Sequence, residues 1–304
     1  MPSSRPTDRV VRVLELLGAH PGGLRFSDLA RAGSLSQGTC HAILGTLSAA
    51  GYVVRDPETL TYTLGPAVVA LGHAASEAFG DVRGHHDELE RLAHGTGLAA
   101  SAAKVVDDAI TVVDVAAPEG VGPPVRVGTR VPFAPPFGAI HVAWSGPRAI
   151  EAWIARAPRD TLTPTRLLAV LDDHRRTRLA VAPYTATSSD LRAALADLAI
   201  DALARDVRER TLALLSEIDE LDYTSDAIAD AEHLAVNTIT APVFDRDART
   251  AFAVALHVGD PELPVARLEV FAEALRTATT TMTTAIGGRE PDDDRSAVLT
   301  GGTS

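Results

Sequence analysis

The chain has little of two residues that often carry protein chemistry: it holds one cysteine, Cys40, and one lysine, Lys104. A single cysteine excludes an internal disulfide bond and a zinc site built on a cysteine cluster. No apolar run reaches the roughly 20 residues that a membrane-spanning helix needs. Residues 1–5 are not followed by the apolar stretch of a secretory signal. These absences predict a cytoplasmic protein with no metal site and no membrane partner.

The net charge of −12 is distributed unevenly along the 304 residues. Residues 1–80 hold six basic and six acidic side chains, whereas the other 224 residues hold 22 basic and 34 acidic ones. An acidic protein does not in general favour nucleic acid. Because the excess acid lies outside residues 1–80, DNA binding through that neutral segment is still allowed.

The first eighty residues have the pattern of three helices followed by two short strands. Apolar residues recur at helical spacing from Val10 to Leu17, and a short helix is expected over 28–32. A third helix should begin at a cap, Ser36, and end near Ala50. Short strands are expected over 52–55 and 61–64, joined by a turn-forming sequence. This order predicts a winged helix-turn-helix; the alternative is a small α/β domain that binds a protein.

In a winged helix-turn-helix, the third helix enters the major groove of DNA. Here that helix carries no arginine, which is the commonest reader of guanine. Arg55, on the first wing strand, is placed to contact a phosphate. The residues of the third helix and its cap that we expect to face DNA are Ser36, Gln37, Thr39, His41, Ala42 and Thr46.

Three motifs follow one another in this segment: RVVRVLELLGAH, FSDLARAGSLSQGTCHAILGTLSAAGYVVRDPE and YTLGPAVVALG. Together they resemble the DNA-binding domain of the IclR family of transcriptional regulators. The resemblance implies a DNA-binding domain at 1–65, a linker helix at 66–80, and a homodimer or homotetramer on double-stranded operator DNA. The family often has Lys, Ser and Arg where this chain has Gln37, Gly38 and Ala42. That departure bears on sequence preference and affinity, and not on the fold.

Residues 81–286 mix strand and helix patterns, and 287–304 are polar and acidic, as in a disordered tail. We therefore expect an α+β chain, in which a winged helix-turn-helix precedes an antiparallel sheet with helices packed on it. The expected strands are 98–106, 110–115, 125–131, 179–181, 236–244 and 250–258, and the expected helices are 66–79, 87–94, 138–157 and 266–286.

Two further stretches, RVGTRVPFAPPFGAIHVAW and NTITAPVFDRDARTAFAVALHVG, resemble segments of the IclR effector-binding domain, which has a GAF/profilin-like fold. The resemblance implies that a small organic effector binds between them. A carboxylate could accept N–H bonds where a helix starts near Gly138. The prolines before it remove donors, and the nearby phenylalanines favour an aromatic or apolar acid. The implied effector-binding residues are Pro136, Phe137, Gly138 and Ala139 on the loop, and Thr238, Thr240 and His257 on the strands.

Residues 185–233 form a helical insertion relative to the family pattern. Its run from 190 to about 220 has an apolar stripe that must be covered. Either the sensor core covers the stripe, which makes the insertion a lid over the effector, or a partner subunit does. The lid is favoured because the chain returns directly to a pocket-lining strand.

Sequence signatures of catalysis are missing. There is no Gly-x-Ser-x-Gly, His-Glu-x-x-His, P-loop or Rossmann fingerprint, so we expect no catalytic residue and no cofactor. Cys40 and His41 are neighbours on a helix, where side chains diverge. The resemblance to the IclR family therefore implies a ligand-responsive regulator of a metabolic or catabolic operon. The alternative is a small-molecule-binding protein whose DNA-binding head is degenerate.

Overall fold

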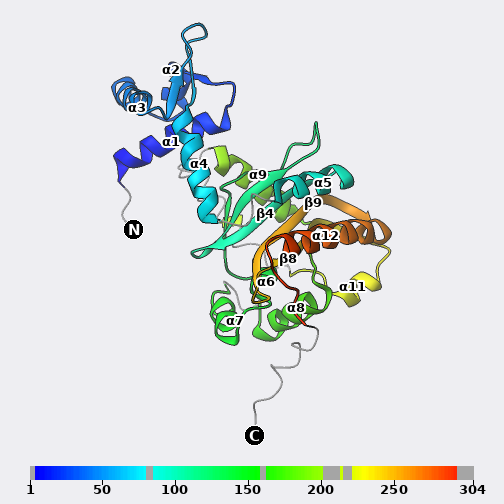
Figure 1. The fold of residues 1–304 in the computed structure, drawn as a ribbon. Coiled ribbons are helices and arrows are strands. Elements are labelled where there is room, and N and C mark those ends of the chain that lie inside the picture. Colours follow the sequence, from blue (N-terminus) through cyan, green and yellow to red (C-terminus); the bar gives the residue numbers. More distant parts are fainter. Residues whose placement is uncertain (1–3, 80–84, 158–161, 201–212, 215–220, 293–304) are drawn as a thin grey trace. The chain divides into compact units, whose positions relative to one another are not determined.

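The computed structural model describes residues 4–79, 85–157, 162–200, 213–214 and 221–292. The chain folds into two compact units, one built on helices α1 to α4 and the other on helices α5 to α12, with α9 divided between the two units at Ala194. Each combines helices with an antiparallel sheet (Figure 1), so the expected α+β class is confirmed. None of the described helices is both long and apolar enough to cross a bilayer.

The N-terminal unit is a winged helix-turn-helix. Its core joins the three helices, and Val13, Leu29 and Leu44 are each at most 2% exposed. Helix α3 begins where the sequence indicates, because Oγ of Ser36 accepts a hydrogen bond from the N–H of Thr39 at 3.2 Å. The elements are α1 (Arg5–Ala19), β1 (Leu24–Arg25), α2 (Phe26–Ala32), α3 (Gln37–Ala49), β2 (Val53–Arg55), β3 (Thr61–Leu64) and α4 (Pro66–Phe79), and the sheet order is β1-β3-β2.

A close backbone contact fixes the exit from the wing against the end of α3. Gly51 follows α3 with φ +75, a left-handed conformation that suits glycine. The N–H of Gly65 donates to the carbonyl of Tyr52 at 2.7 Å. A Cβ atom at Gly65 would lie 2.3 Å from the carbonyl oxygen of Gly51. The YTLG motif therefore ends in glycine because the chain passes too close to the turn for any side chain.

The C-terminal unit is built on a six-stranded antiparallel sheet in the order β6-β5-β4-β9-β8-β7. Helices α5 and α12 pack together and cover one face of it (Figure 1). The elements are α5 (His86–Thr96), β4 (Ala99–Val106), β5 (Ala109–Ala116), β6 (Arg130–Pro132), α6 (Ala139–Val142), α7 (Pro147–Ile154), α8 (Pro164–Thr177), β7 (Ala180–Pro183), α9 (Ala186–Ile200), α11 (Ser225–Ala229), β8 (His233–Phe244), β9 (Thr250–Pro264) and α12 (Val265–Ala285).

Side chains on the central strands alternate between the two faces of this sheet. Ile239 and Leu256, which are 0% exposed, pack into the core beneath α5 and α12. The alternate residues face the other side, where helix α6 lies. There Ile140 of α6 packs with Ala180 and Ala253 of the sheet. This second face carries the strand residues that the sequence assigned to an effector.

Two expected elements are wrong in extent. The helix expected over 138–157 is two helices, α6 and α7, because Gly146 is extended (φ −69, ψ 161) and Pro147 starts a new helix. The strand expected over 125–131 is reduced to the three residues of β6. Helix α8 was not expected, although its buried residues Leu167, Val170 and Leu171 have helical spacing.

The beginning of the expected disordered tail is packed against the C-terminal unit. After α12, the N–H of Gly288 donates to the carbonyl of Thr283 at 2.8 Å, and the N–H of Arg289 donates to that of Asp245 at 3.1 Å. Pro291 is buried. The prediction of disorder is thus wrong for 287–292, and its remainder, 293–304, lies outside the described residues.

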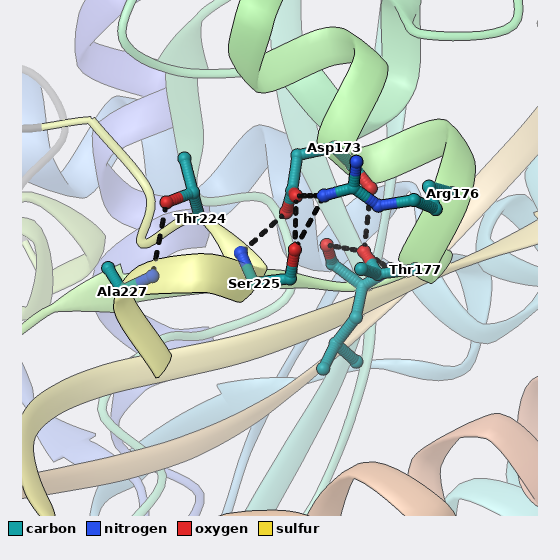
Figure 2. Close-up of polar contacts among 7 residues, drawn as sticks. Asp173, Arg176, Thr177, Thr224, Ser225 and Ala227 are labelled. Carbon is teal, nitrogen blue, oxygen red and sulfur yellow. Dashed lines mark hydrogen bonds and ion pairs between the residues drawn. The ribbon is translucent and has the colours of Figure 1, made fainter. Parts of the chain in front are cut away.

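Polar side chains of α8 hold the end of the insertion. Asp173, 5% exposed, accepts hydrogen bonds from Oγ of Ser225 at 2.7 Å and from its N–H at 3.1 Å, and it pairs with Arg176 (Figure 2). The buried neighbour His174 lies 3.2 Å from a carboxylate oxygen of Asp222. Much of the expected 190–220 helix lies outside the described residues; α9 covers its first part.

Candidate DNA interface and effector site

The face of α3 opposite its buried stripe carries only small residues. Cys40, Ile43, Leu44 and Leu47 point into the core. The exposed residues half a turn away are Gly38, Ala42, Gly45 and Ala49, and nothing lies within 4 Å of a Cβ atom built at either glycine. A helix with this face can bring its backbone close to the floor of a major groove, since no long side chain holds it away.

The polar residues expected to read DNA flank this small-residue face. Hydroxyl contacts hold two of them: Oγ1 of Thr39 lies 2.8 Å from Oγ of Ser36, and Oγ1 of Thr46 donates to the carbonyl of Ala42 at 3.0 Å. On the opposite flank lie Gln37 and His41, both exposed. The His41 ring is edge-on to Phe26, with centroids 6.5 Å apart. All the residues chosen from the sequence therefore lie on the surface of α3 or at its cap.

Sequence reasoning missed an arginine beside the recognition helix. Residues of α1 and α3 line a groove of about 480 Å³, and Arg9 is its one charged lining residue. Arg5, Arg9 and Arg12 are spaced so that they share one face of α1. Arg12 is tied to α2, because its Nη2 donates to the carbonyl of Ala32 at 2.8 Å. The spacing of these arginines in the sequence could have indicated their role. It brings positive charge to α3, which has no charged residue of its own.

On the wing, Arg55 lies on strand β2 and not at the tip of the hairpin. Its guanidinium carbon is 5.8 Å from the centre of the Tyr62 ring, which is within the range of a cation–π contact. The tip carries a carboxylate: Asp56 accepts hydrogen bonds from the N–H groups of Glu58, at 2.7 Å, and Thr59, at 3.2 Å. These bonds lower the pKa of Asp56. Arg55 is therefore better placed than the tip of the hairpin to bind a DNA phosphate.

Cys40 and His41 do not form a catalytic pair. The Cys40 side chain is fully buried, and burial raises the pKa of its thiol. His41 lies on the exposed side of the helix. Among the described residues, no group of three or more His, Cys, Asp or Glu side chains is placed to hold a metal ion.

In the C-terminal unit, contacts with neighbouring side chains fix the loop that the sequence assigns to effector binding. Gly138 has φ +88, and a Cβ atom there would lie 2.6 Å from Cδ2 of Phe133. The indole N–H of Trp153 donates to the carbonyl of Phe137 at 2.9 Å. Ala139 is buried with Trp153. The loop thus offers a rigid backbone.

The helix dipole expected to help a carboxylate at this loop is small. Helix α6, which the loop opens, has only four residues, so its dipole gives little help to a carboxylate. The His141 side chain on α6 keeps some exposure to solvent. Burial nevertheless lowers the pKa of His141 to about 4, so this ring is neutral at pH 7.

Strand register brings the predicted strand residues onto one face of the sheet. Thr238 on β8 is paired with His257 on β9, and Thr240 is paired with Ala255. The hydroxyl of Ser101 on β4 lies 2.9 Å from Nε2 of His257. Ser101 is 3% exposed and was missed by sequence reasoning. These four polar residues, Ser101, Thr238, Thr240 and His257, are called the polar quartet below.

Small residues surround the polar quartet. The register places alanines beside it on all three neighbouring strands. Helix α6 lies on the same face, where Oγ1 of Thr250 donates to the carbonyl of Ile140 at 3.2 Å. The loop and the strands therefore share one side of the sheet. The alanines of this face are Ala99 and Ala103 on β4, Ala180 and Ala182 on β7, and Ala253 and Ala255 on β9.

Comparison with known proteins bears on the N-terminal unit first. Residues 6–57 match the model of the IclR helix-turn-helix domain. Over 291 residues, the chain is 25% identical to the HTH-type transcriptional regulator XynR of Escherichia coli (strain K12), covering 94% of this chain and 99% of that protein. Residues 6–57 are therefore an IclR-type helix-turn-helix domain, and the chain as a whole is similar to a transcriptional regulator.

Solved structures of IclR regulators agree with the fold of this chain. The Thermotoga maritima IclR structure has a TM-score of 0.60 at 15% identity, covering 92% of this chain and 98% of that one. The structure of an IclR homolog from Microbacterium hydrocarbonoxydans, complexed with 4-hydroxybenzoate, has a TM-score of 0.55 at 18% identity, covering 93% and 99%. At these identities, the likeness shows that this chain shares their fold.

Proposed function

We propose that this protein is a regulator of the IclR family, that it binds operator DNA through α3 and the wing, and that a small organic acid bound in its C-terminal unit changes that binding. The operon it controls would be metabolic or catabolic, and it would act in the cytoplasm, where a bacterial chromosome lies. The polar quartet on an alanine-lined sheet face is the observation that carries the sensory half of the proposal.

The DNA target is a near-palindromic duplex bound by a homodimer or by a homotetramer. A two-fold arrangement of winged helices matches the symmetry of such a site. Small residues on the outer face of α3 allow close approach, while Gln37, Thr39 and His41 supply donors and acceptors for base edges. Arg9 and Arg55 supply phosphate contacts. A fluorescence anisotropy titration of full-length protein with duplexes enriched from random DNA tests this, at several salt concentrations.

The effector that fits best is an aromatic or largely apolar acid. Hydroxyls and one imidazole can bind a carboxylate or a phenol, and the alanines and Phe137 leave apolar walls for a ring. The 4-hydroxybenzoate bound by the Microbacterium homolog is a ligand of this class. The described residues named for the site contain no arginine or lysine, so binding would rest on hydrogen bonds.

Calorimetry with a panel of aromatic and aliphatic acids tests the placement. Thr238→Val keeps the shape of the side chain and removes its hydroxyl, so effector affinity should fall about tenfold while DNA binding by the free protein stays unchanged. Thr281→Val, at an exposed residue of α12, is the matched control. Equal ligand affinity in Thr238→Val and the wild type would place the effector elsewhere.

A second candidate function is small-molecule binding without operator recognition. The observation that favours it is the absence of any charged residue from α3. Under that alternative, the protein would bind the acid but would show no preference among duplex sequences in the anisotropy titration.

A further inference from the structure

A small pocket beside the end of α12 gathers positive charge. It has a volume of about 180 Å³, which is about six times the liquid volume of a water molecule. Two arginines and three threonines line it, in a chain whose net charge is −12. Its lining residues are Arg178, Pro242, Phe244, Arg276, Thr279, Thr280, Thr283 and Glu290.

A carboxylate of the same chain already sits among these donors. Glu290 forms an ion pair with Nη1 of Arg178 and accepts a hydrogen bond from Oγ1 of Thr280 at 2.9 Å. Nη2 of Arg178 donates to the carbonyl of Pro291 at 3.1 Å. Side chains of Arg178 and Glu290 are 28% and 38% exposed, so the carboxylate can exchange with solutes. Glu290 thus occupies the pocket as a bound acid would.

The backbone of Arg178 adds a reason to look for a role of its side chain. Arg178 ends α8 in the left-handed conformation, with φ 53 and ψ 33. Glycine or asparagine is the usual residue at such a helix end, because other side chains are strained there. An arginine at this position gives up some backbone stability, and its guanidinium is what reaches the pocket.

We propose that this pocket is a second small-molecule site, which takes a small oxyanion of the phosphate or carboxylate class in place of Glu290. The fork of Arg178 would bind two oxygens of the anion, as guanidinium groups do with phosphates and carboxylates. Oγ1 of Thr280 would donate to another oxygen, and Arg276 would add a second positive charge. The volume admits phosphate or a short dicarboxylate and excludes a nucleotide.

An anion in this pocket would lie against side chains that support α6, the helix that follows the effector loop. Phe244 lines the pocket and meets Trp144 edge to face, with centroids 4.9 Å apart. Trp144 packs beside Ile140 of α6. The Phe244 N–H is bonded to Oγ1 of Thr283, another lining residue, at 3.1 Å. A change at the pocket therefore reaches the helix that opens from the effector loop.

The test compares anion binding by full-length wild type and by Glu290→Gln, using calorimetry with inorganic phosphate and with succinate at constant ionic strength. Removing the competing charge should raise affinity for at least one probe about tenfold or more. Arg178→Met in the Glu290→Gln background should abolish the gain. Glu269→Gln removes one charge from α12 outside this pocket and should bind like the wild type.

Thermal unfolding gives a second readout. The probe anion should raise the melting temperature of Glu290→Gln by several degrees and should leave the Arg178→Met double variant unchanged. The proposal is overturned if Glu290→Gln binds neither probe more tightly than the wild type and gains no stability from them. In that case Glu290 only ties the end of the chain to Arg178.

Discussion

The hydroxyl of Ser101 lies 2.9 Å from Nε2 of His257, so a hydrogen bond joins β4 to β9 across 156 residues of sequence. Both residues face the side of the sheet on which α6 lies. Because Ser101 is buried, its hydroxyl holds the imidazole in one position and leaves the other ring nitrogen to a different partner. This contact makes a fixed polar point on a face otherwise rich in alanine.

Removal of that contact should weaken effector binding. In Ser101→Ala, the His257 ring loses a hydrogen bond worth about 1 kcal/mol and can reorient. Effector affinity should fall roughly five- to tenfold, the melting temperature should fall by a few degrees, and the DNA affinity of the free protein should not change. Calorimetry and anisotropy on the same preparation measure both. An unchanged effector affinity would show that the quartet does not contact the ligand.

Substitutions in the DNA-binding unit should separate positioning from sequence reading. Arg55→Gln and Arg9→Gln should each weaken binding to all duplexes about equally and reduce the salt slope by about one unit. Arg130→Gln, an exposed arginine of the C-terminal unit, is the matched control. Thr39→Ala should instead change preference at particular base pairs. Loss of the same base preference in Arg55→Gln would contradict this division.

The contact between α8 and the end of the insertion should contribute measurable stability. Ser225→Ala removes one of the hydrogen bonds to buried Asp173, so the free energy of unfolding should fall by about 1–2 kcal/mol. Asp173→Ala removes the partner of both Arg176 and Ser225, so the free energy of unfolding should fall further, by about 2–4 kcal/mol. Urea denaturation measures both values. Two variants as stable as the wild type would mean that this cluster contributes nothing to folding.

His141 should make the fold less stable in mild acid. Its pKa is about 4 in the folded chain, against 6.5 as its ordinary value. Stability that is present above pH 6.5 is therefore lost as the pH falls towards 4, on the order of 2 kcal/mol by pH 5. His141→Gln should flatten the profile over this range, whereas His94→Gln, at an exposed site, should not. Parallel profiles for His141→Gln and the wild type would contradict the assignment.

Local patterns in the sequence carry most of the fold. Ser36 predicts the start of α3, and strands are expected over 236–244 and 250–258; both predictions are confirmed by α3, β8 and β9. Helix α8 was not predicted because only its leucines and its valine form an apolar stripe, and that stripe lies between a proline and a run of charged residues. Its start did have a signal, since Thr163 caps it and Pro164 follows. The split between α6 and α7 was signalled by Gly146-Pro147.

The candidate site was less predictable, because its contacts are long-range. Thr238 and His257 came from motifs, and strand register then placed them in direct pairing. Ser101 lies in a strand diluted by alanine, and nothing local marks it as a partner of His257. Glu290 lay in a stretch whose composition resembles a disordered tail, although Arg178, 112 residues earlier, holds it. Composition describes the segment alone and cannot include the partner that binds it.

The account rests most directly on DNA binding that responds to a small acid. The decisive measurement is selection of duplexes from random DNA by the full-length protein, followed by anisotropy titration of the enriched sequence with and without aromatic acids. We expect a near-palindromic site, an affinity that falls steeply with salt, and a change of several-fold on addition of the acid that calorimetry identifies. Failure to enrich any duplex sequence would contradict the account, whatever the protein binds in its C-terminal unit.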